Sequence, residues 1–338
     1  MGEDNTNDND WGIDRRTMIR GAATASTIGL LGVPGLASAA STVATLYADQ
    51  DTEVGEVSVT GSGGSLNVEY DLDDGWRMTE SHVHVTENQD GFPTAGRGNP
   101  KVGNFEYSTE HEPAVTEYTY DNLVQDSDGY VATHAVVEEY EVNYASAVES
   151  SDQGTTKNGG EIAGDRDDPT AALVPDYPEG GEFFSLGFGT ENGGTLEVSF
   201  DCPVVNAEGD DLRIWEVTFG GGYPLETAEV YAWDETNDVW VSLGEADNTD
   251  QGPQGTPDAH TISDFDLGEL DSTSRIKLVD TTDPGPHNGS ADAFDVDGIQ
   301  ALHDCVLREE TAWGEGTEFV DGRGGSWATY FEYDVSES

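Results

Sequence analysis

The sequence predicts an all-β protein made of two antiparallel β-sandwiches, the second inserted into a loop of the first. Two observations indicate this fold class. Short runs in which apolar and polar residues alternate recur along most of the chain, as half-buried antiparallel strands require. After the first forty residues, no stretch repeats its apolar residues with the 3.6-residue period of a helix.

The chain is strongly acidic. Its 338 residues include 69 Asp and Glu but only 13 Lys and Arg, which gives a formal net charge of -56. This balance excludes a nucleic-acid-binding protein of the electrostatic kind, because neutralising phosphates needs clustered Lys and Arg. It also disfavours a polybasic membrane-surface protein. The acid is spread over the whole chain, a pattern that resembles haloarchaeal proteins and implies a medium in which salt screens self-repulsion.

The first 39 residues read as an export signal. Arg15 and Arg16 precede a modestly apolar, Gly- and Ala-rich run over residues 21–36, and small residues follow at 37–39. A twin arginine before such a run predicts a Tat signal, and hence an extracellular or cell-surface protein. The alternative is a transmembrane anchor, but the run contains Pro34 and is short for a membrane span. We expect no transmembrane anchor in the mature chain, because no second apolar stretch appears.

The two cysteines, Cys202 and Cys305, predict one disulfide. In an exported protein a single pair of cysteines most simply bonds to itself. Two separate buried thiols are the alternative.

The alternating runs predict the strands one by one. A Gly-rich segment at 61–64 joins the first two as a hairpin. In chain order the expected strands are 54–60, 65–71, 79–85, 115–120, 130–137, 195–200, 212–218, 228–233, 239–243, 275–279 and 295–302.

The expected boundary between the sandwiches comes from composition and from a resemblance. Residues 150–169 are polar and rich in Gly and Asp, which is typical of a linker. The segments 81–85, 98–103, 105–108 and 132–137 resemble an uncharacterised β-module of exported proteins, in which a His-Ala-Val-Val strand is soon followed by segments like 310–314 and 327–331. Here about 170 residues separate these halves. The resemblance implies an outer sandwich of residues 40–149 and 306–338, with an inserted domain over 170–305.

The insert resembles a galactose-binding-like or discoidin-type jelly roll. The segments that carry this resemblance are 210–217, 228–231, 239–244, 276–280 and 294–299. The resemblance implies a domain that binds glycans or surfaces through loops at one end, often with a structural calcium ion.

Acidic residues of the insert are candidate calcium ligands. Asp292, Asp295 and Asp297 lie close together around its last expected strand, and Asp210, Asp211 and Glu216 belong to a strand that could lie beside it. Calcium takes six to eight oxygen ligands, which carboxylates and backbone carbonyls supply. The alternative is ordinary surface acid, because one residue in five of this chain is acidic.

Three histidines are candidate ligands for zinc or copper. His82 and His84 occupy alternate positions of one strand and therefore share a face, and His134 is centred in another strand. The alternative is that they are packed side chains bonded to carboxylates such as Glu80 or Glu310.

Sequence motifs of enzymes are absent: there is no Gly-x-Ser-x-Gly, His-Glu-x-x-His or phosphate-binding loop. We therefore name no catalytic residue. The predicted function is a secreted or cell-surface binding protein that engages glycan or extracellular matrix components, with structural divalent cations. The alternatives are a His-rich metal-binding protein or metalloenzyme, and a surface-layer or filament component that assembles through its edge strands.

Overall fold

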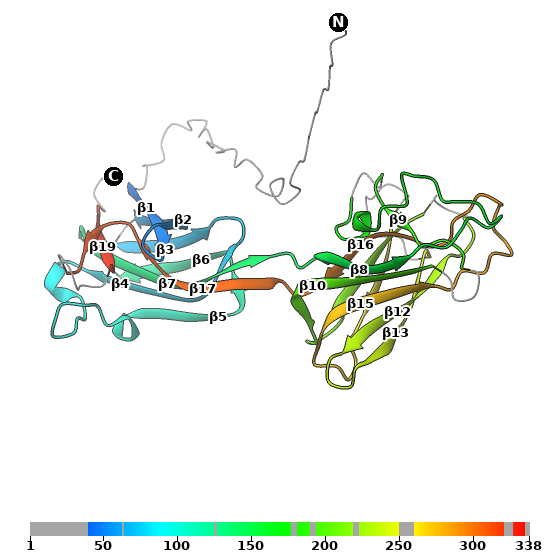
Figure 1. The fold of residues 1–338 in the computed structure, drawn as a ribbon. Helices are drawn as coiled ribbons and strands as arrows, with labels where there is room; N and C mark the ends of the chain where they lie inside the picture. Colours follow the sequence, from blue (N-terminus) through cyan, green and yellow to red (C-terminus); the bar gives the residue numbers. More distant parts are fainter. Residues whose placement is uncertain are drawn as a thin grey trace, which may run out of the picture.

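The computed structural model describes residues 40–62, 64–124, 127–176, 181–189, 194–218, 223–249, 260–320 and 327–334 (Figure 1). The expected export signal, residues 1–39, lies outside them. The described chain is almost entirely antiparallel β-structure in two bodies, which confirms the predicted fold class. Within these ranges no helix has the length and apolar character needed to cross a membrane.

The first sandwich contains ten strands that join in one continuous hydrogen-bonded sheet. Its strand order is β18-β19-β7-β17-β1-β2-β3-β6, and β4 pairs with both β7 and β5. The strands are β1 (Ala40–Ala48), β2 (Thr52–Ser62), β3 (Ser65–Leu72), β4 (Trp76–Thr86), β5 (Tyr107–Val115), β6 (Glu117–Val124), β7 (Gly129–Glu141), β17 (Cys305–Gly314), β18 (Thr317–Glu318) and β19 (Thr329–Tyr333). Two short 3-10 helices, η2 (Gln89–Gly91) and η3 (Val102–Asn104), interrupt the segment between β4 and β5.

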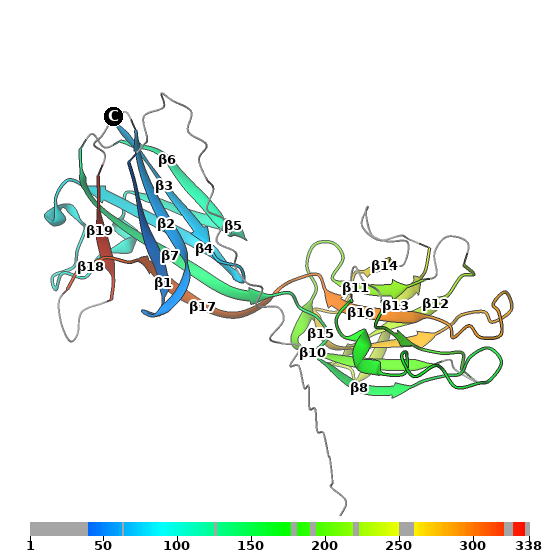
Figure 2. The same ribbon diagram turned by 90° about the horizontal axis from the view of Figure 1, so that it is seen from above.

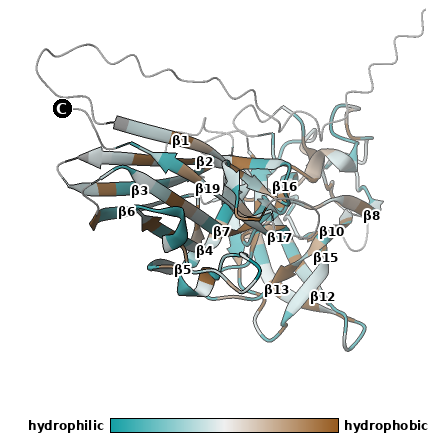
Figure 3. Cartoon of the chain, turned by 90° about the vertical axis from the view of Figure 1, so that its left-hand side faces the viewer, coloured by the Kyte–Doolittle hydropathy of each residue, from teal (hydrophilic) through white to brown (hydrophobic). Residues whose placement is uncertain are grey.

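The core of the first sandwich follows from the alternation in its strands. Along β3, buried and partly exposed side chains alternate, so that Leu66, Val68 and Tyr70 all point inward. Figure 3 shows the same alternation of hydrophobic and hydrophilic positions along β2 and β3. The buried Tyr70 hydroxyl donates to the carbonyl of His82 at 2.8 Å, which satisfies the one polar atom of this side chain.

The second sandwich packs a five-stranded sheet, in the order β13-β12-β15-β10-β8, against a four-stranded sheet, in the order β14-β11-β16-β9. The inner faces share one apolar core, to which Leu196, Ile214, Leu278 and Phe294 contribute. The strands are β8 (Ala147–Asp152), β9 (Phe184–Ser185), β10 (Thr195–Val205), β11 (Leu212–Val217), β12 (Thr227–Asp234), β13 (Val239–Asp247), β14 (His260–Phe265), β15 (Ser272–Asp280) and β16 (Asp295–Ala301).

The second sandwich interrupts the first between β7 and β17. These two strands pair antiparallel from Cys305 opposite Glu141 to Trp313 opposite His134, so the chain leaves and re-enters the first sandwich on neighbouring strands. Figure 2 shows the two bodies side by side, with β7 and β17 running together toward the junction.

The start of the insert differs from the expected linker over 150–169. Residues 147–152 form β8, which pairs with β10 and is an edge strand of the second sandwich. The 3-10 helix η4 (Pro169–Ala172) closes the segment, and its first turn is capped by the Asp168 side chain. Polar side chains on an exposed edge strand are indistinguishable from a linker by composition alone.

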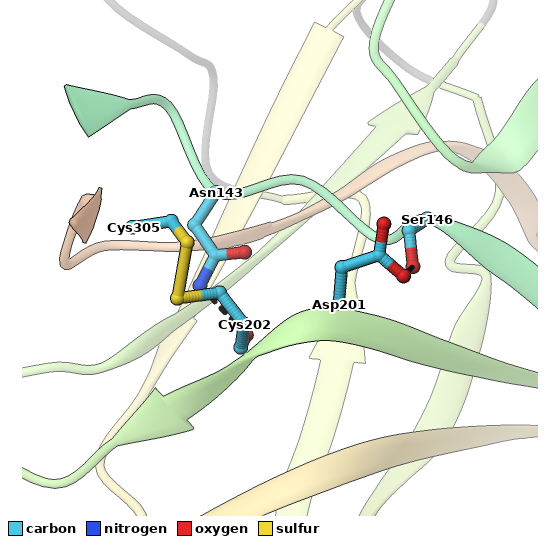
Figure 4. The surroundings of a disulfide bond; sticks show 5 residues. All are labelled: Asn143, Ser146, Asp201, Cys202 and Cys305. Atoms are coloured by element: carbon cyan, nitrogen blue, oxygen red, sulfur yellow. Dashed lines mark hydrogen bonds between the residues drawn. A yellow bond between two sulfur atoms is a disulfide. The ribbon is translucent and has the colours of Figure 1, made fainter. Parts of the chain in front are cut away.

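The predicted disulfide between Cys202 and Cys305 is present. The expected insert, residues 170–305, includes both cysteines, but Cys305 is the first residue of β17 and pairs with β7 of the first sandwich. The bond therefore ties β10 of the second sandwich to the strand by which the chain returns to the first (Figure 4). Beside it, the Asn143 side-chain amide donates to the carbonyl of Cys202 at 3.0 Å.

Candidate functional site

The structure brings two of the three candidate histidines together. His82 on β4 lies opposite His134 on β7, and their Nδ1 atoms are 3.3 Å apart. His84 lies apart from this pair: its Nδ1 accepts a hydrogen bond from the backbone N–H of Glu106, and its ring packs on Phe92.

The histidine pair is buried, with the His134 ring packed against that of Trp313, and burial keeps the pair neutral. Burial and, to a smaller extent, the neighbouring His82 together lower the pKa of His134 to about 3. The His82 pKa is lowered by burial and is raised in part by Glu80, whose Oε1 lies 3.1 Å from His82 Nε2. Two neutral imidazoles at this distance share one hydrogen bond, in which one ring donates and the other accepts.

The six candidate calcium ligands separate into two places. Asp210 is exposed and Asp211 buried at the start of β11. There Asp211 accepts hydrogen bonds from the backbone N–H groups of Ala207 and Leu267, and so fixes two loops. The other four, Glu216, Asp292, Asp295 and Asp297, lie at the opposite end of the sheet, near the end of β11 and the start of β16.

This opposite end, the distal end, lies away from the first sandwich and gathers six buried carboxyl groups. We call them the distal acidic cluster. Each is at most 6% exposed, and each belongs to the distal part of a strand or to the residues just before one. The members are Glu216, Glu226, Asp280, Asp292, Asp295 and Asp297.

Several carboxylate oxygens of the cluster have hydrogen-bond donors. The Ser185 hydroxyl donates to Asp295 at 2.5 Å and lies 3.2 Å from Asp292. Arg166 Nη1 forms an ion pair with Asp292 at 2.6 Å. Among the described residues, no other Lys or Arg forms an ion pair with a member of the cluster.

Other buried polar atoms at the distal end have no hydrogen-bond partner among the described residues. These include Oε1 of Glu216, Oε2 of Glu226 and Nδ1 of His287. The His287 Nδ1 lies 3.7 Å from Glu226 Oε1, which is too long for a hydrogen bond. Buried polar atoms are nearly always paired in folded proteins, so a group of orphaned ones at one end of a sandwich calls for a physical explanation.

The crowding of acid raises the pKa values in the cluster. Burial, followed by the charges of Asp295, Glu216, Asp292 and Asp280, raises the pKa of Glu226 to about 10. Burial raises that of Glu216 to about 8, although a hydrogen bond from Thr261 lowers it in part. Asp295 is fully buried beside Asp292, and its pKa lies well above the ordinary value. At neutral pH part of the cluster therefore carries protons.

The described side chains do not by themselves form a metal cage. Within the described ranges, no three His, Cys, Asp or Glu side chains are arranged to hold one metal ion. This applies both to the histidine pair and to the distal acidic cluster. The carboxyl groups lie close enough to shift one another's pKa, but they do not converge as a set of ligands.

Sequence reasoning missed Glu226, Asp280 and Arg166. A signal for the first two was present, because Glu226 stands just before one expected strand and Asp280 just after another. In an antiparallel sheet the end of one strand lies beside the start of its neighbour, so Glu226 and Asp280 belong at the same end of their sheet. Nothing in the sequence around Arg166 marks it.

Comparison with known proteins identifies no family. No family model matches the chain, and no curated protein matches it either. Eight chains of solved structures match. One is the C-terminal domain of a chitobiase from Bacteroides fragilis, at 12% identity and a TM-score of 0.29, covering 48% of this chain and 95% of that one. Another is allantoicase from Saccharomyces cerevisiae, at 10% identity and a TM-score of 0.25, covering 75% and 79%. These likenesses are too remote to assign a family or a function.

Proposed function

We propose that this chain is a secreted or cell-surface binding protein that engages glycan or extracellular matrix components, and that the distal end of the second sandwich is its ligand-binding end. One observation carries the proposal: at this end, buried polar atoms have no hydrogen-bond partner among the described residues. A ligand or ion that supplies the missing partners would remove the energetic cost of leaving them unpaired.

A structural divalent cation belongs to the proposal as a separate hypothesis. Six buried carboxyl groups with one guanidinium partner need further positive charge if they are to ionise. Calcium, a hard cation that takes carboxylate and carbonyl oxygens, would supply it. Since the side chains do not converge as they stand, calcium binding would have to draw them together, with backbone carbonyls completing the ligand set.

Export by the Tat route and life in concentrated salt are also proposed. The first rests on the twin arginine and the run that follows it, and the second rests on the acidic composition.

The test is a calcium titration and a glycan array, both in concentrated KCl. We expect calcium to raise the melting temperature and a set of glycans to bind. We also expect Glu226→Gln to weaken the calcium response, while Glu269→Gln, at an exposed position between β14 and β15, leaves it unchanged. Failure of every glycan to bind would contradict the binding function, and the lack of a calcium-dependent shift would remove the cation alone.

The histidine pair favours a second candidate, a metal-binding protein. The two Nδ1 atoms lie 3.3 Å apart, which is close enough for both to bind one metal ion. Elemental analysis of protein purified without chelators decides this: zinc or copper at one equivalent, lost in His134→Leu, supports it, and metal-free protein rejects it.

A further inference from the structure

The outer face of the five-stranded sheet carries a group of aromatic and cationic side chains. Along β12 and β15, Val230, Ala232, Ile276 and Leu278 are fully buried in the core of the second sandwich. Because side chains alternate along a strand, the residues between them point outward. Together with one residue of β13 they form what we call the aromatic–cationic face: Tyr231, Trp233, Trp240, Arg275 and Lys277.

The five side chains form one contiguous group. Trp233 and Trp240 are cross-strand neighbours, with ring centroids 5.1 Å apart. The Arg275 guanidinium lies 4.2 Å from the ring centroid of Trp233. The Lys277 ammonium lies 4.4 Å from that of Trp240 and 4.9 Å from that of Tyr231. All five are only partly buried, and the main contacts of β12 and β15 are with their neighbours in the sheet.

This face holds two of the few cations of the protein, with the carboxylate of Glu197 directly opposite Lys277 on β10. Only 13 of the 338 residues are Lys or Arg, and two of these lie side by side here on β15. Arg275 is paired with Glu197 at 3.1 Å. For Lys277, the described residues provide no ion pair. Its ammonium group therefore keeps hydrogen-bond donors for an external anion.

We propose that the aromatic–cationic face binds an anionic polysaccharide. Lys277 and Arg275 would hold its carboxylate or sulfate groups, and the sugar rings would pack against Trp240 and Tyr231. Aromatic rings offer a large apolar surface to such a ligand, and charge-assisted hydrogen bonds are the strong ones. The proposal rests on the glycan-binding function and deepens it by naming the class of glycan and a second place on the same sandwich.

Concentrated salt is the condition in which this ligand can approach. At low ionic strength the net charge of -56 repels an anionic polymer over long distances. In molar salt the screening length falls to about 3 Å, so that only groups in contact still interact. The cations of the face then act without opposition from distant acid.

The test is retention of the protein on immobilised polysaccharide in concentrated KCl. A uronate polymer, a sulfated dextran and plain dextran are the three probes, so the uronate and sulfate sources of negative charge are distinguished from each other and from a neutral sugar. The variants are Lys277→Glu and Trp240→Ala. The matched control is Arg213→Gln on β11 of the other sheet, where Arg213 lies 5.8 Å from the Trp215 ring centroid and pairs with Asp264.

We expect at least one anionic probe to bind and plain dextran not to bind. Lys277→Glu and Trp240→Ala should each weaken binding by about three- to tenfold, and Arg213→Gln should leave it unchanged. If Lys277→Glu or Trp240→Ala melts at a lower temperature than the wild type, Lys277→Gln or Trp240→Phe replaces it, because these variants keep the packing. Equal retention of the wild type on charged and plain dextran would overturn the proposal, and so would wild-type binding by both variants.

Failure here and failure of the proposed function give different results. If the glycan array finds neutral ligands that Glu226→Gln weakens and the face variants do not, the distal-end function stands and this face is structural. If no glycan of any kind binds, both proposals fail. If the variants change sedimentation but not polysaccharide retention, the face contacts a second copy of the chain and the proposal is wrong.

Discussion

The two sandwiches differ in whether they bury carboxyl groups. Among its described residues the first buries hydroxyls and imidazoles but no carboxyl group, and most of these polar groups form hydrogen bonds, as Tyr70, Ser81 and the pair of His82 and His134 show. The second buries hydroxyls and imidazoles too, but it also buries carboxyl groups, most of them at one end, and oxygens of Glu216 and Glu226 there have no partner among the described residues. The difference indicates that the first sandwich is built for stability, while the distal end of the second carries an energetic cost of the kind typical of a functional site.

The two kinds of group also predict opposite responses to pH. A buried imidazole whose pKa is lowered makes the folded state less stable as the solution becomes acidic. A buried carboxyl group whose pKa is raised makes the folded state less stable as the solution becomes alkaline. We therefore expect the first sandwich to unfold more readily in acid and the second in alkali. Scanning calorimetry across pH would test whether two transitions move in opposite directions.

The largest expected effect comes from the bond that joins the two bodies. Replacing both Cys202 and Cys305 by Ser should lower the free energy of unfolding by about 2–5 kcal/mol, because the bond closes a long loop in the unfolded chain. Urea unfolding of the double variant beside the wild type measures this. Equal midpoints for the two proteins would show that the bond contributes nothing to stability.

Glu226→Gln should reduce the loss of stability in alkaline solution that we expect for the second sandwich. The folded state holds the Glu226 proton up to a pKa of about 10, against 4.5 in the unfolded chain, so its contribution to stability is complete below pH 4.5 and declines as the pH rises toward 10. A neutral amide removes this decline and should stabilise the protein at pH 8 by about 1–3 kcal/mol. Melting temperatures from pH 4 to 9 check it, with Glu269→Gln as the exposed control. Parallel curves for wild type and Glu226→Gln would refute it.

His134→Leu should reduce the loss of stability in acidic solution that we expect for the first sandwich. The unfolded chain takes up a proton near pH 6.5 and the folded chain only near 3, so stability is lost as the pH falls through this range, by up to about 1 kcal/mol per pH unit. The variant should flatten this acid limb in a calorimetric series from pH 7 to 4. Glu226→Gln should leave the acid limb as it is, and a limb unchanged by His134→Leu would point to other groups.

The smallest effect is expected at the junction. Arg77 on β4 pairs with Glu138 and with Asp304, both at 3.0 Å, and its guanidinium lies 4.7 Å from the Tyr140 ring centroid. Because the pairs are partly exposed, Arg77→Gln should cost about 1 kcal/mol or less, and less still in concentrated salt. Denaturant unfolding at two salt concentrations measures it, and a loss that grows with salt would contradict an ionic origin.

The sequence by itself determined eleven of the nineteen strands of the described chain, and the nesting of the two bodies was predicted from a resemblance to a known β-module. Alternation with period two is a local property, so runs such as 65–71 and 228–233 matched β3 and β12 without knowledge of their partners. The disulfide followed from a count of two cysteines. Strands with polar or irregular sequences, such as β5, β8 and β14, carried too weak an alternation to be predicted.

Only the tertiary structure decided which polar residues are buried and which of them meet. Asp210 and Asp211 are neighbours in the sequence, but one is exposed and the other fully buried, because loops more than fifty residues away close over the second. His82 and His84 share a strand, yet only His82 lies opposite His134. Glu226 and Asp280 join the distal acidic cluster because strands far apart in the chain have their ends at the same end of the second sandwich. Burial and proximity arise from such long-range contacts, which no local pattern of residues encodes.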